Sequence, residues 1–101
     1  MKRTVLFYKT TDGKCPVQEF LDSLPGKVAQ KIVWGGKKLV GTEEIWECRI
    51  QFGSNTYRIF CFFIDNSVIL THGFIKKSQR TPPYEIERAE AYRRDFFKRR
   101  V

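Results

Sequence analysis

Cations gather at one point of the chain where a strand-like stretch stops. Lys76, Lys77 and Arg80 fall within five residues, directly after the apolar segment 68–75 and just before two prolines. Lysine and arginine side chains placed around a phosphate stabilise the negative charge that grows during phosphate-ester cleavage. Solubility does not require such clustering, so we expect these cations to face an anionic partner.

Arginine also occurs where a strand should be apolar. In the segment 56–64, Arg58 alternates onto the same face as Phe60 and Phe62. A guanidinium on an apolar face is costly unless an acid or a ligand meets it. The sequence leaves two explanations open, which are a local ion pair with an acid such as Glu47 and an anionic ligand. Arg49, on the preceding predicted strand, can join Arg58 in one region of a sheet.

Other kinds of catalytic site find little support in the residues. The single histidine, His72, lies inside a predicted strand, where a structural role is more common than a catalytic one. There is no Walker loop, GxSxG, HExxH, CxxC or Cys/His zinc spacing, so neither a metal nor a cofactor is expected. The carboxylates of the last predicted helix interleave with arginines, which is typical of a solvated, salt-bridged face. If the substrate is RNA, its own 2′-hydroxyl can act as the nucleophile.

The overall composition favours a polyanionic partner. The chain has 101 residues, enough for one domain, and a net charge of +8. Residues 76–101 hold nine Lys/Arg against four Asp/Glu, so this quarter carries most of the excess. Nucleic acid is the favoured partner, with an acidic protein or simple solubility as alternatives. No apolar segment is long enough for a membrane span or a secretory signal, so we expect a cytoplasmic protein. The three cysteines are expected to be free thiols.

The predicted elements follow in the order βααβββα. Residues 4–9 form a first strand, and residues 15–24 and 25–34 form two helices, the second ended by Gly35-Gly36. Three strands over residues 43–52, 56–64 and 68–77 are joined by short turns and predict an antiparallel meander. This is an α+β domain with helices against one side of an antiparallel sheet.

The last predicted helix runs from about residue 83 to 99. Thr81 is placed as its N-cap and Pro82 at its first position. One helical stripe carries the apolar anchors Ile86, Ala89, Tyr92 and Phe96.

Several short motifs together resemble one known family. They are W-E-x-R at residues 46–49, Y-R-I at 57–59, H-G-F-x-K-K-x-Q-x-T-P at 72–82 and E-I-x-x-A at 85–89. In combination they resemble the RelE/HigB-like toxins of bacterial type II toxin–antitoxin systems, in particular a phage-derived HigB-like branch. The resemblance is close over residues 43–96 and loose over the first 34.

The resemblance implies a fold, an activity and partners. It implies a compact RelE-like domain with two N-terminal helices, the second one shortened, and a C-terminal helix. It also implies metal-independent cleavage of mRNA on the translating ribosome, and neutralisation by a cognate helix-turn-helix antitoxin of the HigA type. Arg49, Arg58 and Lys77 fall where the family places its cationic active-site residues, and Lys76 and Arg80 are their neighbours. The candidates for a general base are His72, Tyr84 and Tyr92.

Two other hypotheses compete with a toxin enzyme. One is a basic nucleic-acid-binding module that is catalytically weak or inactive and still binds an antitoxin, because the segment before Lys37 looks shortened relative to this branch. The other is a purely structural partner of another protein. Arg58 on an otherwise apolar strand argues against a plain scaffold, which has no need of a cation there.

Overall fold

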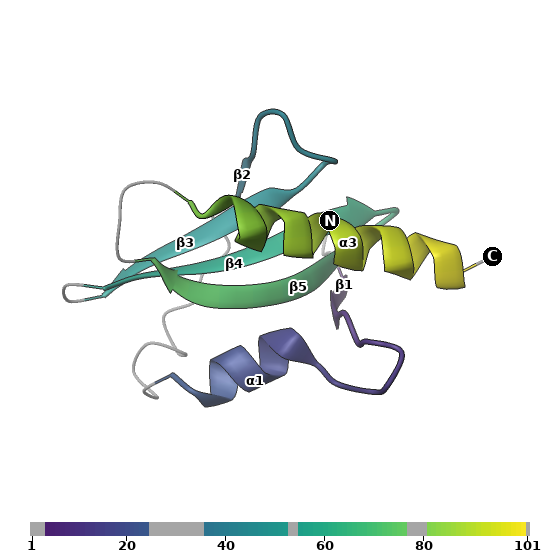
Figure 1. The fold of residues 1–101 in the computed structure, drawn as a ribbon, viewed down its shortest axis with the longest axis horizontal. Coiled ribbons are helices and arrows are strands. Elements are labelled where there is room, and N and C mark those ends of the chain that lie inside the picture. The colour runs from purple at the N-terminus through teal and green to yellow at the C-terminus, as the bar shows by residue number, and fades with distance from the viewer. Residues whose placement is uncertain (1–3, 25–35, 53–54, 77–80, 101) are drawn as a thin grey trace.

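The structure is a computed structural model, which describes residues 4–24, 36–52, 55–76 and 81–100 (Figure 1). Its elements are β1 (Thr4–Phe7), α1 (Pro16–Asp22), β2 (Gly36–Lys38), β3 (Trp46–Phe52), β4 (Asn55–Ile64), β5 (Ser67–Lys76) and α3 (Pro83–Arg99). The predicted second helix, residues 25–34, and the Gly35 at its end lie outside the described residues.

The strands form one five-stranded mixed sheet in the order β1-β5-β4-β3-β2. The predicted meander is confirmed, since β3, β4 and β5 pair antiparallel with their neighbours. The prediction of a wholly antiparallel sheet is wrong, because β1 runs parallel to β5 at one edge. Alternation of apolar and polar residues shows which side chains face a core, but it does not show which neighbour a strand takes or in which direction.

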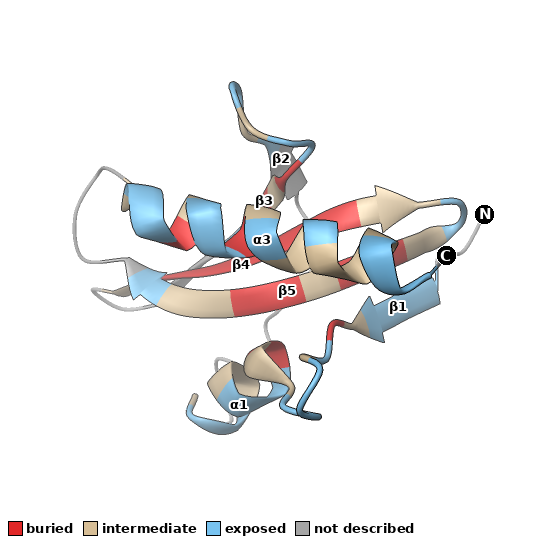
Figure 2. Cartoon of the chain, turned by 45° about the vertical axis from the view of Figure 1, so that its right-hand side comes forward, coloured by how far each residue is buried: buried red, intermediate tan, exposed pale blue. Residues whose placement is uncertain are grey.

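Helices cover both faces of the sheet, which corrects the prediction that they lie on one side. From α1, Val17 and Phe20 pack in a cluster with Ile59 of β4. On the opposite face Ala89 of α3 packs with Phe60. Neighbouring residues of a strand point to opposite faces, and both faces of β4 are apolar, so each face requires a covering helix. Figure 1 shows α1 and α3 on opposite sides of the sheet, and Figure 2 shows the buried run of β4 between them.

The last helix has the predicted bounds but a different start. All four predicted anchors, Ile86, Ala89, Tyr92 and Phe96, lie in the core clusters. The helix begins at Pro83 with Pro82 as its N-cap, so the assignment of Thr81 as cap and Pro82 as first residue is wrong by one position. A residue that precedes proline is driven out of the α region, and Pro82 accordingly has φ −60° and ψ 130°.

A short edge strand escaped prediction. β2 pairs antiparallel with β3, and Lys38 is the partner of Trp46. The hairpin turn between them is closed by a bond from the Leu39 amide to the Ile45 carbonyl and includes Gly41 at φ 78°. A three-residue strand is too short to show a period of two, so alternation cannot reveal it.

The cysteines are free, as expected, and Cys48 and Cys61 are buried while Cys15 is half-buried. Burial raises the pKa of the Cys61 thiol to about 12, which keeps it protonated and unreactive. No helix within the described ranges is long and apolar enough to cross a membrane.

Gly73 of β5 provides a test of how α1 docks on the sheet. A Cβ at this position would lie 2.8 Å from Cγ of Phe20, closer than side chains approach one another. We expect Gly73→Ala to lower the free energy of unfolding by about 1–3 kcal/mol, because the extra methyl group overpacks the contact. Urea denaturation measures this loss.

The control is the same substitution in a Phe20→Leu background. Because leucine would still carry a Cγ at this place, a second background, Phe20→Ala, removes the contacting atoms altogether, and there Gly73→Ala should cost much less. An equal loss in the wild type and in the Phe20→Ala background would show that Phe20 does not occupy this position.

Candidate functional site

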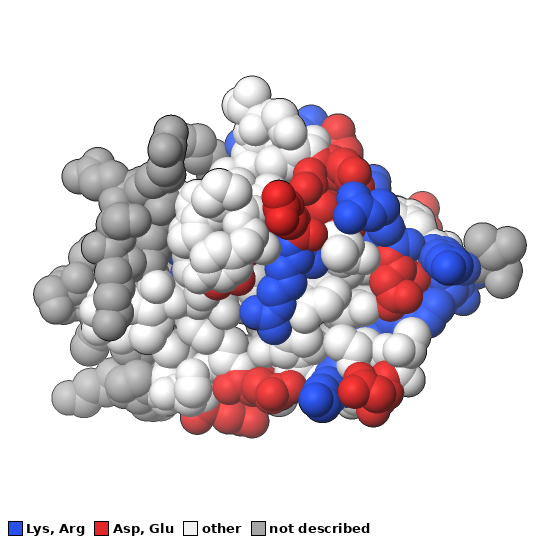
Figure 3. Space-filling view, viewed as in Figure 1, with Lys and Arg blue, Asp and Glu red and all other residues white. Residues whose placement is uncertain are grey.

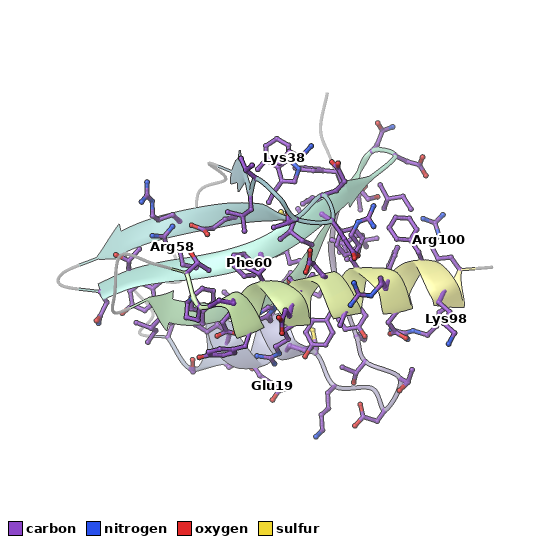
Figure 4. The ribbon with its side chains drawn as sticks, turned by 45° about the horizontal axis from the view of Figure 1, so that its top comes forward. Glu19, Lys38, Arg58, Phe60, Lys98 and Arg100 are labelled. Carbon is purple, nitrogen blue, oxygen red and sulfur yellow. The ribbon has the colours of Figure 1, made fainter. Side chains whose placement is uncertain are left out.

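Arg49 and Arg58 are direct partners across the β3–β4 ladder. Side chains of paired residues lie on the same face of an antiparallel sheet, so both arginines belong to the face that α3 covers. Figure 4 shows Arg58 on β4 near the start of α3, with Phe60 two residues further along the same strand. The first two residues of the predicted catalytic set are therefore brought together by register.

The two arginines differ sharply in their surroundings. Arg58 is 7% exposed and forms a buried ion pair with Glu47 of β3, which is 6% exposed. Its Nε atom is buried and has no hydrogen-bond partner within the described part of the chain. Burial lowers the pKa of Arg58, although a guanidinium stays protonated in proteins. Of the two explanations left open by the sequence, the local ion pair with Glu47 is the one found.

Arg49 remains open to solvent. Among the described residues no acidic side chain forms an ion pair with it, although its strand neighbour Glu47 lies on the same face. Arg49, Arg58 and Glu47 are called the guanidinium trio below. The trio carries one net positive charge, and Arg49 is its solvent-facing member.

The other predicted cations are only partly placed. Lys76 is the last residue of β5 and its backbone pairs with Thr56, two residues before Arg58 on β4. The strand therefore ends beside the guanidinium trio, but the side chain of Lys76 is outside the described set. Lys77 and Arg80 lie outside the described residues altogether, so their roles stay predictions.

His72 is a core residue with polar partners on both ring nitrogens. It is 1% exposed, with Nε2 at 3.1 Å from Oε1 of Glu85 and Nδ1 at 3.2 Å from Oγ1 of Thr71. Burial, and then the charge of Arg88, lower its pKa to about 3, so the imidazole is neutral near pH 7. In this position His72 holds the first turn of α3 onto β5 and does not face solvent.

Glu85 corrects one prediction about the last helix. It was expected on the solvated face with the other carboxylates, but it is 6% exposed and bonded to His72. Burial raises its pKa, against the opposing charge of Arg88. A usable signal was present, because Glu85 lies four residues before the anchor Ala89 and so shares its stripe.

The two tyrosine candidates for a base occupy different environments. Tyr84, in the first turn of α3, is 66% exposed. Tyr92 is half-buried, stacks on Tyr8 with ring centroids 4.6 Å apart, and accepts a hydrogen bond of 2.9 Å from Nε of Arg88. Only Tyr84 of the three named candidates is free to approach a bound chain from solvent.

Much of the charge on α3 is internally paired. Arg94 bonds to Glu43 at 2.7 Å, and Arg99 bonds to Asp95 at 2.7 Å. Figure 3 shows acidic and basic side chains interleaved along the face of this helix that is turned to the viewer. The positive excess of the C-terminal quarter is therefore partly neutralised within the fold. Within the described ranges, no cluster of His, Cys, Asp and Glu is arranged to hold a metal ion.

The mixed sheet with helices on both faces is compatible with a compact RelE-like domain. The family model for the Phage derived protein Gp49-like family (DUF891) matches residues 19–94. The chain belongs to this family, which is RelE-like and toxin-like. No curated protein matches the chain. No solved structure matches it either.

The buried ion pair can be tested by single and double substitutions. We expect Arg58→Met alone to cost about 3–5 kcal/mol of unfolding free energy, because Glu47 is left as an uncompensated buried charge. The double variant Glu47→Leu with Arg58→Met removes both charges and should recover most of that loss. Denaturant unfolding of the four proteins gives the coupling, and strictly additive losses would show that the two side chains do not interact.

The protonation of His72 predicts how stability varies with pH. The unfolded chain binds a proton on this residue near pH 6.5, whereas the folded chain does so only near pH 3. Unfolding therefore takes up a proton between these values, and the free energy of unfolding should fall as pH drops from 6.5 toward 3. The slope due to His72 is at most about 1.4 kcal/mol per pH unit. Glu85 opposes it, because its raised pKa retains a proton in the folded state.

A His72→Gln variant is the matched comparison, since glutamine can still hydrogen-bond Glu85 but does not titrate. The urea concentration at the unfolding midpoint, measured at pH 4, 5 and 6.5, should rise more steeply with pH for the wild type than for the variant. Identical slopes would mean that His72 is not held neutral in the fold.

Proposed function

We propose that this protein is the toxin of a toxin–antitoxin module and cleaves mRNA on the translating ribosome without a metal ion. The observation that carries the proposal is the register pairing of exposed Arg49 with buried Arg58, at the end of the sheet where β5 leads toward Lys77. Membership of a RelE-like, toxin-like family supports it. The finer assignment to a HigB-like branch rests on the sequence resemblance.

In this proposal the residues have separate tasks. Arg49 contacts the non-bridging oxygens of the scissile phosphate, and the buried ion pair of Arg58 with Glu47 lies on the same face of the sheet. Lys77 is the second contacting cation, while Lys76 and Arg80 hold the neighbouring phosphates. Arg49 is held on β3 before the reaction begins, so it stabilises developing charge without reorganisation.

The bond changes follow from the chemistry of RNA. The ribose 2′-oxygen attacks phosphorus and loses its proton to a general base, for which Tyr84 is the exposed candidate. The bond from phosphorus to the 5′-oxygen breaks, and that oxygen takes a proton from water. The products are a 2′,3′-cyclic phosphate and a 5′-hydroxyl end, and no oxidant or cofactor is consumed.

The partners belong to the proposal as well. A ribosome supplies the positioned message, and the net charge of +8 favours association with its phosphate-rich surface. A cognate antitoxin with a helix-turn-helix domain of the HigA type neutralises the toxin. Both partners, and the mRNA substrate, place the protein in the cytoplasm.

A second candidate function is favoured by the Glu47–Arg58 ion pair. Because Glu47 neutralises Arg58, Arg49 is the only solvent-facing cation among the described members of the predicted catalytic set. A site with less positive potential can bind RNA and still cleave it poorly. The protein would then be a catalytically weak nucleic-acid-binding module that retains its antitoxin.

Replacement of Arg49 separates the two candidates. Arg49 is exposed and without an ion pair to a described acid, so we expect Arg49→Ala to fold normally and to lower cleavage of a ribosome-bound message by about 10²–10³-fold. Lys77→Ala should have a similar effect. The first measurement is cleavage of a defined message on purified ribosomes. The second is made in cells, where new 5′ ends of mRNA are mapped after induced expression with and without the proposed antitoxin.

Arg94→Ala is the matched control, since it removes an exposed arginine from α3 with the same change in net charge. It should leave cleavage near the wild-type rate. Equal cleavage by wild type, Arg49→Ala and Lys77→Ala would remove these cations from the reaction. A wild-type protein that binds ribosomes and never cuts would support the binding module.

A further inference from the structure

Two arginines in the second half of α3 are held by aromatic rings and not by acids. The Cζ atom of Arg93 lies 4.8 Å from the ring centroid of Phe97, and that of Arg100 lies 5.7 Å from the ring centroid of Phe96. Neither arginine forms an ion pair with an acid in the part of the chain that the structure describes. Arg93 and Arg100 are called the ring-held arginines below.

The flat shape of a guanidinium makes this arrangement suitable for binding a phosphate. One face can rest on an aromatic ring while the N–H groups at the edge remain free to bond phosphate oxygens. An aromatic ring also fixes the side chain without neutralising its charge. By contrast Arg94 bonds to Glu43, and Arg99 bonds to Asp95. The ring-held arginines therefore keep a full positive charge for a ligand.

The ring-held arginines share one side of the helix. Arg100 follows Arg93 by seven residues, which is close to two helical turns, so both belong to one stripe with Phe96 and Phe97 between them. Their Cα atoms are then about 10 Å apart along the helix axis. With this spacing the two guanidinium groups can contact two different phosphates of one strand.

The helix macrodipole alone does not explain the arrangement. Cations in the last turn of a helix offset the partial negative charge of its free carbonyl groups, and Lys98 and Arg99 are placed to do so. The effect falls off within that turn, and Arg93 lies outside it. The dipole also gives no reason for an aromatic ring beneath each guanidinium.

We propose that the ring-held arginines form a second RNA-binding surface, which holds phosphates of an RNA backbone at the end of α3 remote from the candidate cleavage site. Figure 4 shows Arg58 near the start of α3 and Arg100 at its end. A helix of 17 residues is about 25 Å long, so the two surfaces are well separated. This inference rests on the proposed function in taking RNA as the ligand, and it requires no cleavage. The strand is supplied by ribosomal RNA or by a more distant part of the message.

The experiment measures how binding of an uncleavable probe depends on salt. The probe is a fluorescent 2′-O-methyl RNA strand that is long enough to span both ends of α3. Each phosphate contact that is lost should lower the slope of log affinity against log salt by about 0.7. We expect Arg93→Gln with Arg100→Gln to bind about tenfold more weakly and to lower the slope by about 1.4. Unchanged affinity and slope in this folded double variant would overturn the inference.

Two further variants separate the surface from net charge and from folding. Arg94→Gln with Lys98→Gln removes the same number of charges at exposed positions of the same half of α3, and should keep the wild-type slope. Figure 4 shows Lys98 and Arg100 on different sides of the last turn. An equal loss in this control would mean that only net charge matters, which contradicts the proposal. Arg100→Gln alone changes an exposed residue at the helix end, and should lower the slope by about 0.7 without disturbing the core.

Two other readouts identify the source of the strand and separate this surface from the nuclease proposal. Weaker binding of the double variant to ribosomes without a message assigns the surface to ribosomal RNA. Normal ribosome binding with weaker binding to the probe assigns it to the message. In cleavage assays the double variant should raise KM, whereas Arg49→Ala should lower kcat. Because the probe cannot be cleaved, a protein that never cuts RNA leaves the binding result standing, and the two failures are distinguishable.

Discussion

The burial of β4 on both faces is the constraint from which the rest of the structure follows. From Tyr57 to Phe62 the strand is continuously buried, so its two faces need separate cover. The α1 helix packs over the side of Ile59, and α3 packs over the side of Phe60. A strand with apolar side chains on both faces lies in the interior of a sheet, and here β3 and β5 flank it. The one charged residue in this run is Arg58, and its position explains why Glu47 must also be buried.

Polar contacts hold α3 on its face at both ends of the helix. At the first turn Glu85 bonds to His72, and near the last turn Tyr8 donates to Asp95 at 2.6 Å. Burial and the carboxylate of Asp95 raise the pKa of Tyr8 to about 12, so its hydroxyl remains a donor. Arg99 also bonds to Asp95, which ties the end of the chain to the residue that follows β1. These tethers position α3 over the face that carries Arg58.

Patterns of short range in the sequence predicted most of the local structure. Alternation located β3, β4 and β5, and the helical stripe located the anchors of α3, because each pattern reflects which side chains are buried. The parallel pairing of β1 depends on a contact between distant parts of the chain, and no local pattern encodes it. The edge strand β2 is too short to show the alternation of side chains that identifies a strand in a sequence. The charge of Glu85 favours a surface position, whereas its spacing of four residues from Ala89 puts it on the buried stripe of α3, and the structure follows the spacing.

The candidate site was likewise predicted where short-range patterns decide it, and not where contacts between distant residues decide it. Motif spacing placed Arg49 and Arg58 together, and register then showed that they are direct partners. Sequence alone left the partner of Arg58 open, because the carboxylate of Glu47 and an external anion can each neutralise the guanidinium and accept its hydrogen bonds. The choice depends on desolvation. A buried guanidinium without a counterion costs several kcal/mol whenever no ligand is bound. A resident carboxylate removes this cost at all times and weakens the potential offered to a ligand. The exposed Arg49, which pays little desolvation, is then the residue that can meet a phosphate directly.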